Sequence, residues 1–502
     1  MGLQRTSMRL ASVSLLAGIS LAAGSSDLRV PEAARSRDTA AVRALIQKGA
    51  DVRAVQPDGA TALHWAAHWS DADMVAVLIR AGASVDARND LGVTPLALAA
   101  LNGNVAIAQA LLAAGANANA VQDRTGETVL MTAARTGSAP VVAALLDRGA
   151  DVNATEPNRG QTALMWAASE QHPEVIRLLI QRGADVHARA KSGYTALLFA
   201  ARDGDVETAR SLIEGGARPN DAATDGLTPL VVATVRGRTA FAEFLLDHGA
   251  DPNGMTAGYT ALHWAAGTWV TQLTGKFGIT PESKEWGALG GLRGPVKLAF
   301  VKQLLAHGAD PNARIAKTPP LFGTSFSSHC AANCGRGIGL PLNHSLNNVL
   351  GVNLDGATPL LLAAEAGDAA VMRALLDAGA DPTLTSKEKT TPLMLAAGLS
   401  WTAGQSLVTE TSVLEAVKVA LEAGNDINAA SLYGDTPLHG ASRSGMNSVI
   451  QFLVDHGARV DARNNWGETP LLITEGGGRR LNGELIVRKE SAELLRKLGA
   501  RE

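Results

Sequence analysis

The chain has little charge, few aromatic side chains and only two cysteines. Of its 502 residues 19% are charged and 4% are aromatic, and the formal net charge is −3. Proteins that bind nucleic acids carry a strongly basic face, which this charge balance does not provide. Small residues dominate instead, among them 52 glycines. This composition favours many short, closely packed helices over one large core.

Long apolar runs are absent after the first residues. Arg5 and Arg9 precede an apolar run at residues 10–23, and Ala22-Ala23-Gly24 has the small side chains of a cleavage site. The run has about 14 residues, whereas a membrane-spanning helix needs about 20. We therefore predict a signal peptide at residues 1–24, no transmembrane segment, and a periplasmic or secreted bacterial protein. An uncleaved anchor and a disordered apolar start are the alternatives.

Motifs of the common catalytic sites are also missing. The sequence has no glycine-rich phosphate loop with a lysine, no His-Glu-x-x-His and no nucleophile elbow. His248, His307 and His456 each precede a glycine that ends a predicted helix, where a cation complements the helix dipole. An active site needs converging groups, and these histidines lie at separate helix ends. We expect neither enzyme activity nor a cofactor.

What the sequence does contain is a repeat of about 33 residues. The pattern Gly-x-Thr-x-Leu occurs ten times, and an eleventh copy at Thr390 lacks the glycine. From the threonine to the glycine that closes the unit there are 21 residues in eight copies, as from Thr61 to Gly82. The copies begin at Gly59, Gly92, Gly126, Gly160, Gly193, Gly226, Gly258, Gly356, Gly434 and Gly467.

Each position of the repeat has a mechanical reason. Threonine caps a helix N-terminus, and proline, as in Pro95, suits the first helical turn. The leucine and the following Ala-Ala pair lie on one helix face. A second apolar segment ends at a glycine such as Gly149, which can adopt the left-handed conformation found after helices. Each unit is therefore predicted to be a helix–turn–helix.

These units resemble the ankyrin repeat. Residues 61–67 (TALHWAA) and 436–439 (TPLH) match the motif of its first helix, and residues 149–154 (GADVNA) match its closing motif. The resemblance implies an all-α solenoid of about twelve repeats that binds another protein through its concave face. The motif histidine is present only as His64, His263 and His439. The backbone bonds that this histidine makes in the family are therefore not available in the other copies.

One slot of the first helix, directly before Ala-Ala, is often aromatic. In an ankyrin fold the first helices line the concave surface, so an exposed aromatic row there would be a candidate binding stripe. Packing against the neighbouring repeat is the alternative, because large aromatic side chains are usually buried. The residues in this slot are Trp65, Trp166, Phe199 and Trp264.

The repeat is interrupted by two large insertions around the eighth copy. About 27 residues are added between Thr260 and Gly308, and about 38 between Gly308 and Gly356, with a helix expected at residues 296–307 between them. About 12 more are added between Thr391 and Gly424. Long insertions in repeat arrays are often functional. Further candidate partner-binding residues in the two large insertions are Trp269, Trp286, Phe326 and Arg336.

Both cysteines, Cys330 and Cys334, lie in the second large insertion. In an exported protein they would most simply form a disulfide. Free thiols and a metal site completed by His329 and His344 remain open, although the second histidine lies ten residues away in unpatterned sequence. We predict the disulfide and no metal.

These observations give one favoured interpretation. The segments are a signal peptide at 1–24, repeats at 25–266, an interrupted repeat at 267–355, and repeats with a C-terminal cap at 356–502. We predict a monomeric exported scaffold that binds a protein through its concave face and an inserted lobe. An enzyme or metal-dependent factor with a site in the insertions, and a secreted effector directed at a host, are the alternatives.

Overall fold

The computed structural model describes residues 27–255, 258–267, 292, 294–316, 355–399, 408–477 and 487–501. The chain divides into two compact units, Met1–Arg124 and Thr125–Glu502. Within the described residues all secondary-structure elements are helices, and the only β-pairing is an isolated bridge between Val55 and Thr61. The predicted all-α class is confirmed.

The first unit contains three pairs of short antiparallel helices in its described part. In each pair the first helix follows a turn and the second runs back beside it. The bounds are α1 (Arg29–Arg35), α2 (Thr39–Gln47), α3 (Ala62–His68), α4 (Ala72–Arg80), α5 (Pro95–Leu101) and α6 (Val105–Ala113).

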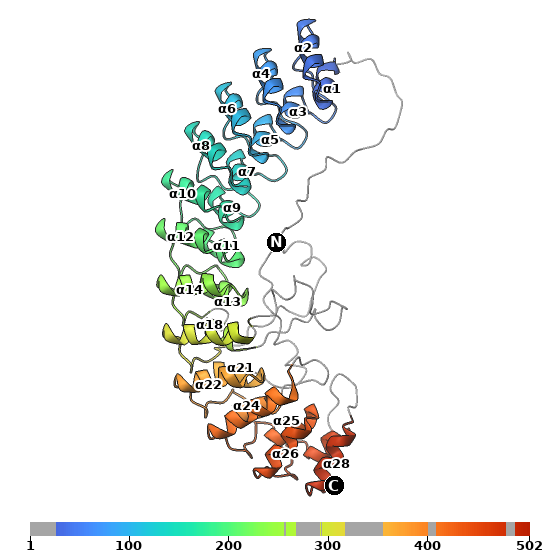
Figure 1. Ribbon diagram of the computed structural model, residues 1–502, viewed down its shortest axis with the longest axis vertical. Helices are drawn as coiled ribbons and strands as arrows, with labels where there is room; N and C mark the ends of the chain where they lie inside the picture. The colour runs from blue at the N-terminus through green and yellow to red at the C-terminus, as the bar shows by residue number, and fades with distance from the viewer. Residues whose placement is uncertain are drawn as a thin grey trace. The chain divides into compact units, whose positions relative to one another are not determined.

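The second unit continues the pattern with nine described pairs, so that the described chain has the twelve pairs predicted from the repeat. Figure 1 shows α7, α9, α11 and α13 in one row and α8, α10, α12 and α14 in a second row beside it. The first helices are α7 (Val129–Thr136), α9 (Ala163–Ser169), α11 (Ala196–Asp203), α13 (Pro229–Val235), α15 (Ala261–Ala266), α21 (Pro359–Glu365), α23 (Pro392–Ala396), α25 (Pro437–Ser444) and α27 (Pro470–Thr474). The second helices are α8 (Ala139–Asp147), α10 (Pro173–Gln181), α12 (Val206–Glu214), α14 (Thr239–Asp247), α18 (Gly294–Ala306), α22 (Ala369–Asp377), α24 (Glu410–Glu422), α26 (Asn447–Asp455) and α28 (Lys489–Lys497).

The helix ends form as the repeat predicts. Thr162 is extended at the N-cap of α9, and its hydroxyl accepts a hydrogen bond from the Met165 amide. Pro229 is the first residue of α13, a position whose N–H has no partner within the helix, so the lack of an N–H in proline costs no hydrogen bond. Second helices often begin with an acidic or amide N-cap, as Asp205 does for α12. Each side-chain cap is worth about 1 kcal/mol, which matters for helices this short.

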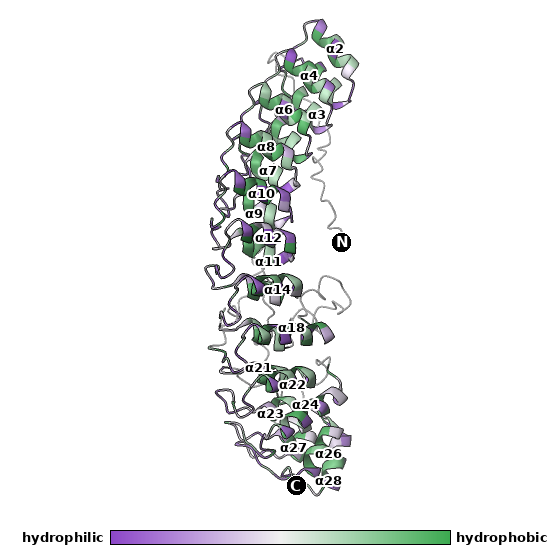
Figure 2. Cartoon of the chain, turned by 60° about the vertical axis from the view of Figure 1, so that its left-hand side comes forward, coloured by the Kyte–Doolittle hydropathy of each residue, from purple (hydrophilic) through white to green (hydrophobic). Residues whose placement is uncertain are grey.

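The core runs between the two helix rows. Leu164 and the Ala167-Ala168 pair of α9 are buried, as are Val175 and Leu179 of α10. The alanines leave little side chain between neighbouring first helices, so the backbones approach closely. Figure 2 shows the helices mostly hydrophobic and the turns between repeats hydrophilic.

A ladder of asparagine side chains joins consecutive repeats. Asn220 donates to Gly249 O at 3.0 Å and accepts from the Asp251 amide at 2.8 Å. Asn153, Asn253, Asn312 and Asn428 make the same pair of bonds to the repeats that follow them. Asn253 bonds to residues that directly follow α18, and Asn312 bonds to residues that directly follow α22, so the ladder continues past both large insertions. The eighth repeat is the pair α15 and α18.

The three motif histidines add a second link between repeats. The Thr260 amide donates to Nδ1 of His263 at 3.1 Å, so Nε2 carries the proton and donates to Ala313 O at 3.1 Å and to Ala357 O at 3.3 Å. His64 and His439 bind Val93 O and Glu468 O in the same way. The bonds that the sequence analysis assigned to this histidine are therefore present at all three positions.

Candidate functional site

Arginine and aromatic side chains gather on the first helices in the middle of the second unit. We name this surface the arginine–aromatic face, and it consists of Arg135, Trp166, Tyr194, Phe199, Arg202 and Arg236. Arg135, in the last turn of α7, places its guanidinium carbon 5.4 Å from the ring centre of Trp166 on α9. It also lies 3.7 Å from a carboxylate oxygen of Glu127. The cation–π contact thus joins two consecutive repeats.

Arg202 lies in the last turn of α11 and contacts a ring of its own helix. Its guanidinium donates to the Ser169 hydroxyl at 2.8 Å and pairs with Asp203 at 3.0 Å. The same group lies 5.8 Å from the ring centre of Phe199, against which the Tyr194 ring packs at 5.5 Å. Burial is the main cause that raises the pKa of Tyr194 to about 12, so this hydroxyl stays protonated at neutral pH.

Arg236 extends the face to the end of α13. Its Nε is buried without a hydrogen-bond partner in the described part of the chain. Burial lowers the pKa of this guanidinium, and the positive charge of Arg202 lowers it further. The side chain of Arg238 packs across Gly204, so closely that a Cβ on residue 204 would lie 2.6 Å from the Cδ of Arg238. The Nε of Arg238 lies 3.5 Å from the carbonyl oxygen of Arg202.

The four residues of the aromatic slot are not equally exposed. Phe199 is 9% exposed and Trp264 is 7% exposed, whereas Trp65 and Trp166 are half-buried. Tyr259 packs 5.3 Å from Trp264, in the way that Tyr194 covers Phe199. The four aromatic side chains therefore do not form a continuous exposed row, because Phe199 and Trp264 are buried by packing.

Trp65 belongs to a separate cluster in the first unit. Its ring stacks on Trp69 at 6.2 Å, and the Arg35 and Arg37 guanidiniums lie 5.4 Å and 3.9 Å from the centres of Trp65 and Trp69. Trp65 Nε1 donates to Gln56 at 2.6 Å. The indoles pack over the end of α1, which fixes them as part of the terminal repeats.

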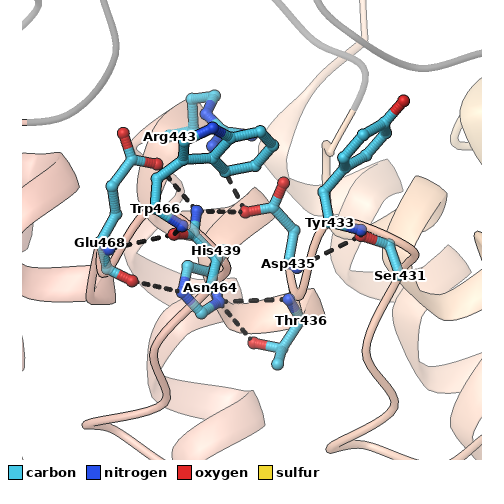
Figure 3. A network of polar contacts seen from close by, with 9 residues as sticks. All are labelled: Ser431, Tyr433, Asp435, Thr436, His439, Arg443, Asn464, Trp466 and Glu468. Carbon is cyan, nitrogen blue, oxygen red and sulfur yellow. Dashed lines mark hydrogen bonds and ion pairs between the residues drawn. The ribbon is translucent and has the colours of Figure 1, made fainter.

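A polar network organises the last repeats of the second unit. Figure 3 shows the Asn464 amide between two carboxylates, donating to Asp435 at 2.9 Å and to Glu468 at 2.8 Å. Both carboxylates are 5% exposed, and Arg443 lies 3.7 Å from Asp435. Two buried acids are thus held by one amide and one guanidinium.

This network fixes two turns that carry aromatic rings. Tyr433 and Trp466 precede the glycines of consecutive repeats, and their rings stack at 5.5 Å with planes 27° apart. Trp466 is 44% exposed, and its amide donates to Asn464 at 3.0 Å. An exposed aromatic pair on rigid turns is a second candidate contact surface.

The histidines at helix ends cap their own helices. Nδ1 of His248, His307 and His456 lies 2.7 Å, 2.9 Å and 2.7 Å from the carbonyl oxygen four residues earlier. Gln303 O and Phe452 O also accept from the backbone amides of His307 and His456, so there the ring adds a second bond to the same carbonyl. All three lie at helix C-termini, the position predicted from the sequence.

Family models identify the repeats directly. A sequence model described as "Ankyrin repeats (3 copies)" matches residues 32–122, 107–190, 197–273 and 406–474. A second, described as "Ankyrin repeat", matches residues 355–387. These segments cover more than half of the chain. The chain belongs to the ankyrin-repeat family. Ankyrin repeats generally mediate protein–protein interaction.

The curated relatives match this chain over only part of their length. The human Ankyrin repeat and SOCS box protein 16 is 33% identical over 245 residues, which is 42% of this chain and 50% of that protein. Potassium channel KOR1 of Oryza sativa subsp. japonica is 39% identical over 80 residues, or 16% of this chain and 9% of that protein. This ankyrin-repeat chain therefore spans half or less of the length of these relatives.

Among solved structures, the human ASB11 ankyrin repeat domain aligns with a TM-score of 0.41 and 26% sequence identity. The alignment covers 44% of this chain and 98% of that domain.

Several predicted site residues lie outside the described residues. They are Trp269, Trp286, Phe326, Arg336, Cys330, Cys334, His329 and His344, together with the signal peptide at 1–24. Within the described ranges no helix is long and apolar enough to span a membrane. The same ranges contain no group of three His, Cys, Asp or Glu side chains placed to hold a metal ion.

Sequence reasoning missed the arginines of the face and the aromatic turns. An arginine follows Ala-Ala directly in two copies, at Arg135 and Arg202, so a signal was present. Tyr433 and Trp466 both stand directly before a repeat glycine, which is a turn position. Neither pattern indicates by itself that an arginine will lie over a ring or that two turns will bring rings together.

Proposed function

We propose that this ankyrin-repeat protein binds a protein partner through the arginine–aromatic face of its second unit. The observation that carries the proposal is the cation–π contact of Arg135 with the half-buried Trp166 of the next repeat, beside which Arg202 binds Ser169 at the end of the Trp166 helix. Arginine and tryptophan are the side chains that most often dominate binding energy in interfaces. Here they are already ordered by packing, so binding would lose little side-chain entropy.

The inserted residues around the eighth repeat would add specificity to this surface. α18 begins at Gly294 and α21 at Pro359, so both insertions join the stack beside α15. We further propose export to the periplasm or beyond, on the strength of the apolar run at residues 10–23 behind Arg5 and Arg9. A disulfide between Cys330 and Cys334 suits such a compartment.

Comparing variants in a capture experiment tests the proposed face. Full-length protein is used to capture partners from the extract of its own source, and bound proteins are quantified for Trp166→Ala, Arg135→Gln and Lys302→Gln. Lys302 is exposed on α18, a second helix, and serves as the charge-matched control. The two face variants should lose the partner that the wild type and the control retain, with unchanged helical content by circular dichroism.

The second surface is tested in the same experiment. Trp466→Ala removes the exposed ring of the aromatic turns and leaves the arginine–aromatic face intact. If this variant alone loses the partner, binding takes place at the last repeats and the proposed face is wrong.

A further inference from the structure

The N-cap of α14 is one of several second-helix N-caps without a side-chain cap bond, the others being Ser138, His172, Met446 and Arg488. Asp205 caps α12 by accepting from the Thr208 amide at 2.8 Å, and Asp368 caps α22 by accepting from the Val371 amide at 3.1 Å. At the same position α14 has Arg238, which makes no side-chain cap bond. A cation replaces an acceptor at the positive end of a helix, which is unfavourable on both counts.

The neighbouring arginine is also held at a cost. Arg236 keeps its Nε buried without a hydrogen-bond partner in the described residues, beside the like charges of Arg202 and Arg238. The Asp203 carboxylate, whose charge acts on Arg236, is already bound by Arg202 at 3.0 Å. Proteins break local rules of this kind mainly at functional sites.

Resting on the proposed function, we infer that the partner segment bound by the arginine–aromatic face is acidic, and that Arg236 and Arg238 receive its carboxylates. An anion placed between them would offset the like charges that Arg202 and Arg238 place beside Arg236. It would also bring negative charge to the N-terminus of α14, where the helix dipole favours it. Charge-assisted hydrogen bonds to guanidinium are the strongest of the common hydrogen bonds.

The spread of the arginines favours a peptide over a single small anion. Arg135 lies in the last turn of α7, Arg202 in the last turn of α11, and Arg236 follows α13, so the cationic groups come from three repeats in a run of four. Neighbouring packed helices lie about 8–10 Å apart. One inorganic ion therefore cannot contact arginines that are spread over four repeats. An extended acidic segment can contact all of these groups while its apolar atoms pack on Trp166.

The test uses the full-length protein and two labelled peptides, one of alternating glutamate and alanine and one in which glutamine replaces glutamate. Binding is followed by fluorescence anisotropy at low salt, since exposed ion pairs are screened by salt. The glutamate peptide should bind and the glutamine peptide should not. Arg236→Gln and Arg238→Asp should each weaken binding by about tenfold or more.

Arg238→Asp separates loss of binding from loss of folding. The aspartate supplies the N-cap acceptor that α14 lacks, so the variant should melt at a higher temperature than the wild type while it binds the peptide more weakly. Arg218→Asp is the matched control, because Arg218 is exposed after α12 and the charge change is the same. Its binding should equal that of the wild type.

Three outcomes overturn the inference. Equal weakening by Arg238→Asp and Arg218→Asp would show that only net charge matters. Displacement of the peptide by inorganic phosphate at equal concentration would show a small-anion site. Peptide binding unchanged in Arg238→Asp, with partner capture lost in Trp166→Ala, would refute the acidic segment and leave the proposed face standing. Partner capture unchanged in Trp166→Ala, with peptide binding lost in Arg238→Asp, would refute the face alone.

Discussion

His263 is the residue whose protonation the fold constrains most strongly. It is fully buried, and its Nδ1 is occupied by the Thr260 amide while Nε2–H donates to carbonyl oxygens of the next repeat. Only the neutral ring with the proton on Nε2 makes all of these bonds. Burial lowers its pKa to about 4, against an ordinary value of 6.5. His64 and His439 shift in the same direction for the same reason.

The second unit should therefore lose stability in mild acid. Between pH 6.5 and about 4 the unfolded chain binds a proton at His263 that the folded chain does not accept, so the free energy of unfolding falls as the pH falls through that window. At pH 5 the His263 contribution should be about 2 kcal/mol below its value at neutral pH. Guanidinium unfolding followed by circular dichroism at the two pH values measures it.

His263→Gln is the control for that prediction. This variant has no titrating group at the position, so its unfolding free energy should change less between pH 7 and pH 5 than that of the wild type. An equal change in both proteins would mean that other groups carry the acid sensitivity.

The aromatic slot shows where reasoning from single residues reaches its limit. The sequence places Trp65, Trp166, Phe199 and Trp264 at one position, and the structure gives them different burial. The deciding residue is the one before the cap threonine. A tyrosine there covers Phe199 and Trp264, while Ala60 and Gln161 leave Trp65 and Trp166 half-buried. That covering depends on ring placement, which the repeat pattern does not contain.

At the scale of elements, the asparagine ladder explains why a broken repeat still stacks. Asn312 makes to Gly379 and Asp381 the same bonds, at 3.0 Å and 2.8 Å, that Asn220 makes to Gly249 and Asp251. The sequence separation is 67 residues in the first case and 29 in the second. The bonds do not depend on the length of chain between their partners.

Removing either asparagine should therefore cost the same. Asn312→Ala and Asn220→Ala each lose one donated and one accepted bond at an exposed junction, so each should lower the free energy of unfolding of the second unit by about 1–2 kcal/mol. Denaturant titration of the two variants measures this. A much smaller loss for Asn312→Ala would contradict the junction described between the eighth repeat and the next.

The helix between the two large insertions was predictable from the sequence, but the burial of its lysine was not. The predicted helix at 296–307 is α18 (Gly294–Ala306), which begins two residues earlier. Its first turn carries Lys297, 2% exposed, whose Nζ lies 3.2 Å from the Asp368 carboxylate at the N-cap of α22. Spacing along the chain could not show that this lysine would be buried against the next repeat.

At the scale of the whole molecule, the second insertion leaves and re-enters the stack across a single turn. Ile315 N–H donates to Ala357 O at 2.9 Å, and Gly356 N–H donates to Ile315 O at 3.0 Å. The same two bonds close the uninterrupted turn of residues 190–194. In the uninterrupted turn two residues, Lys191 and Ser192, separate the two bonded residues Ala190 and Gly193. In the interrupted turn the corresponding stretch runs from Ala316 through the inserted residues to Asp355. The stack is thus complete without residues 317–354.

Excising residues 317–354 should leave a folded protein whose turn is Ile315-Ala316-Asp355-Gly356-Ala357, with the length of the regular repeat. Closing a loop of about 40 residues costs roughly 2 kcal/mol more than closing a turn of a few, so the melting temperature should be unchanged or higher. Circular dichroism melts of the deletion and the wild type check this, and a collapse of the melt would contradict the junction. Because the deletion also removes Cys330 and Cys334, partner capture by the folded variant then assigns function. Capture retained assigns it to the arginine–aromatic face alone, and capture lost assigns a share of it to the inserted residues.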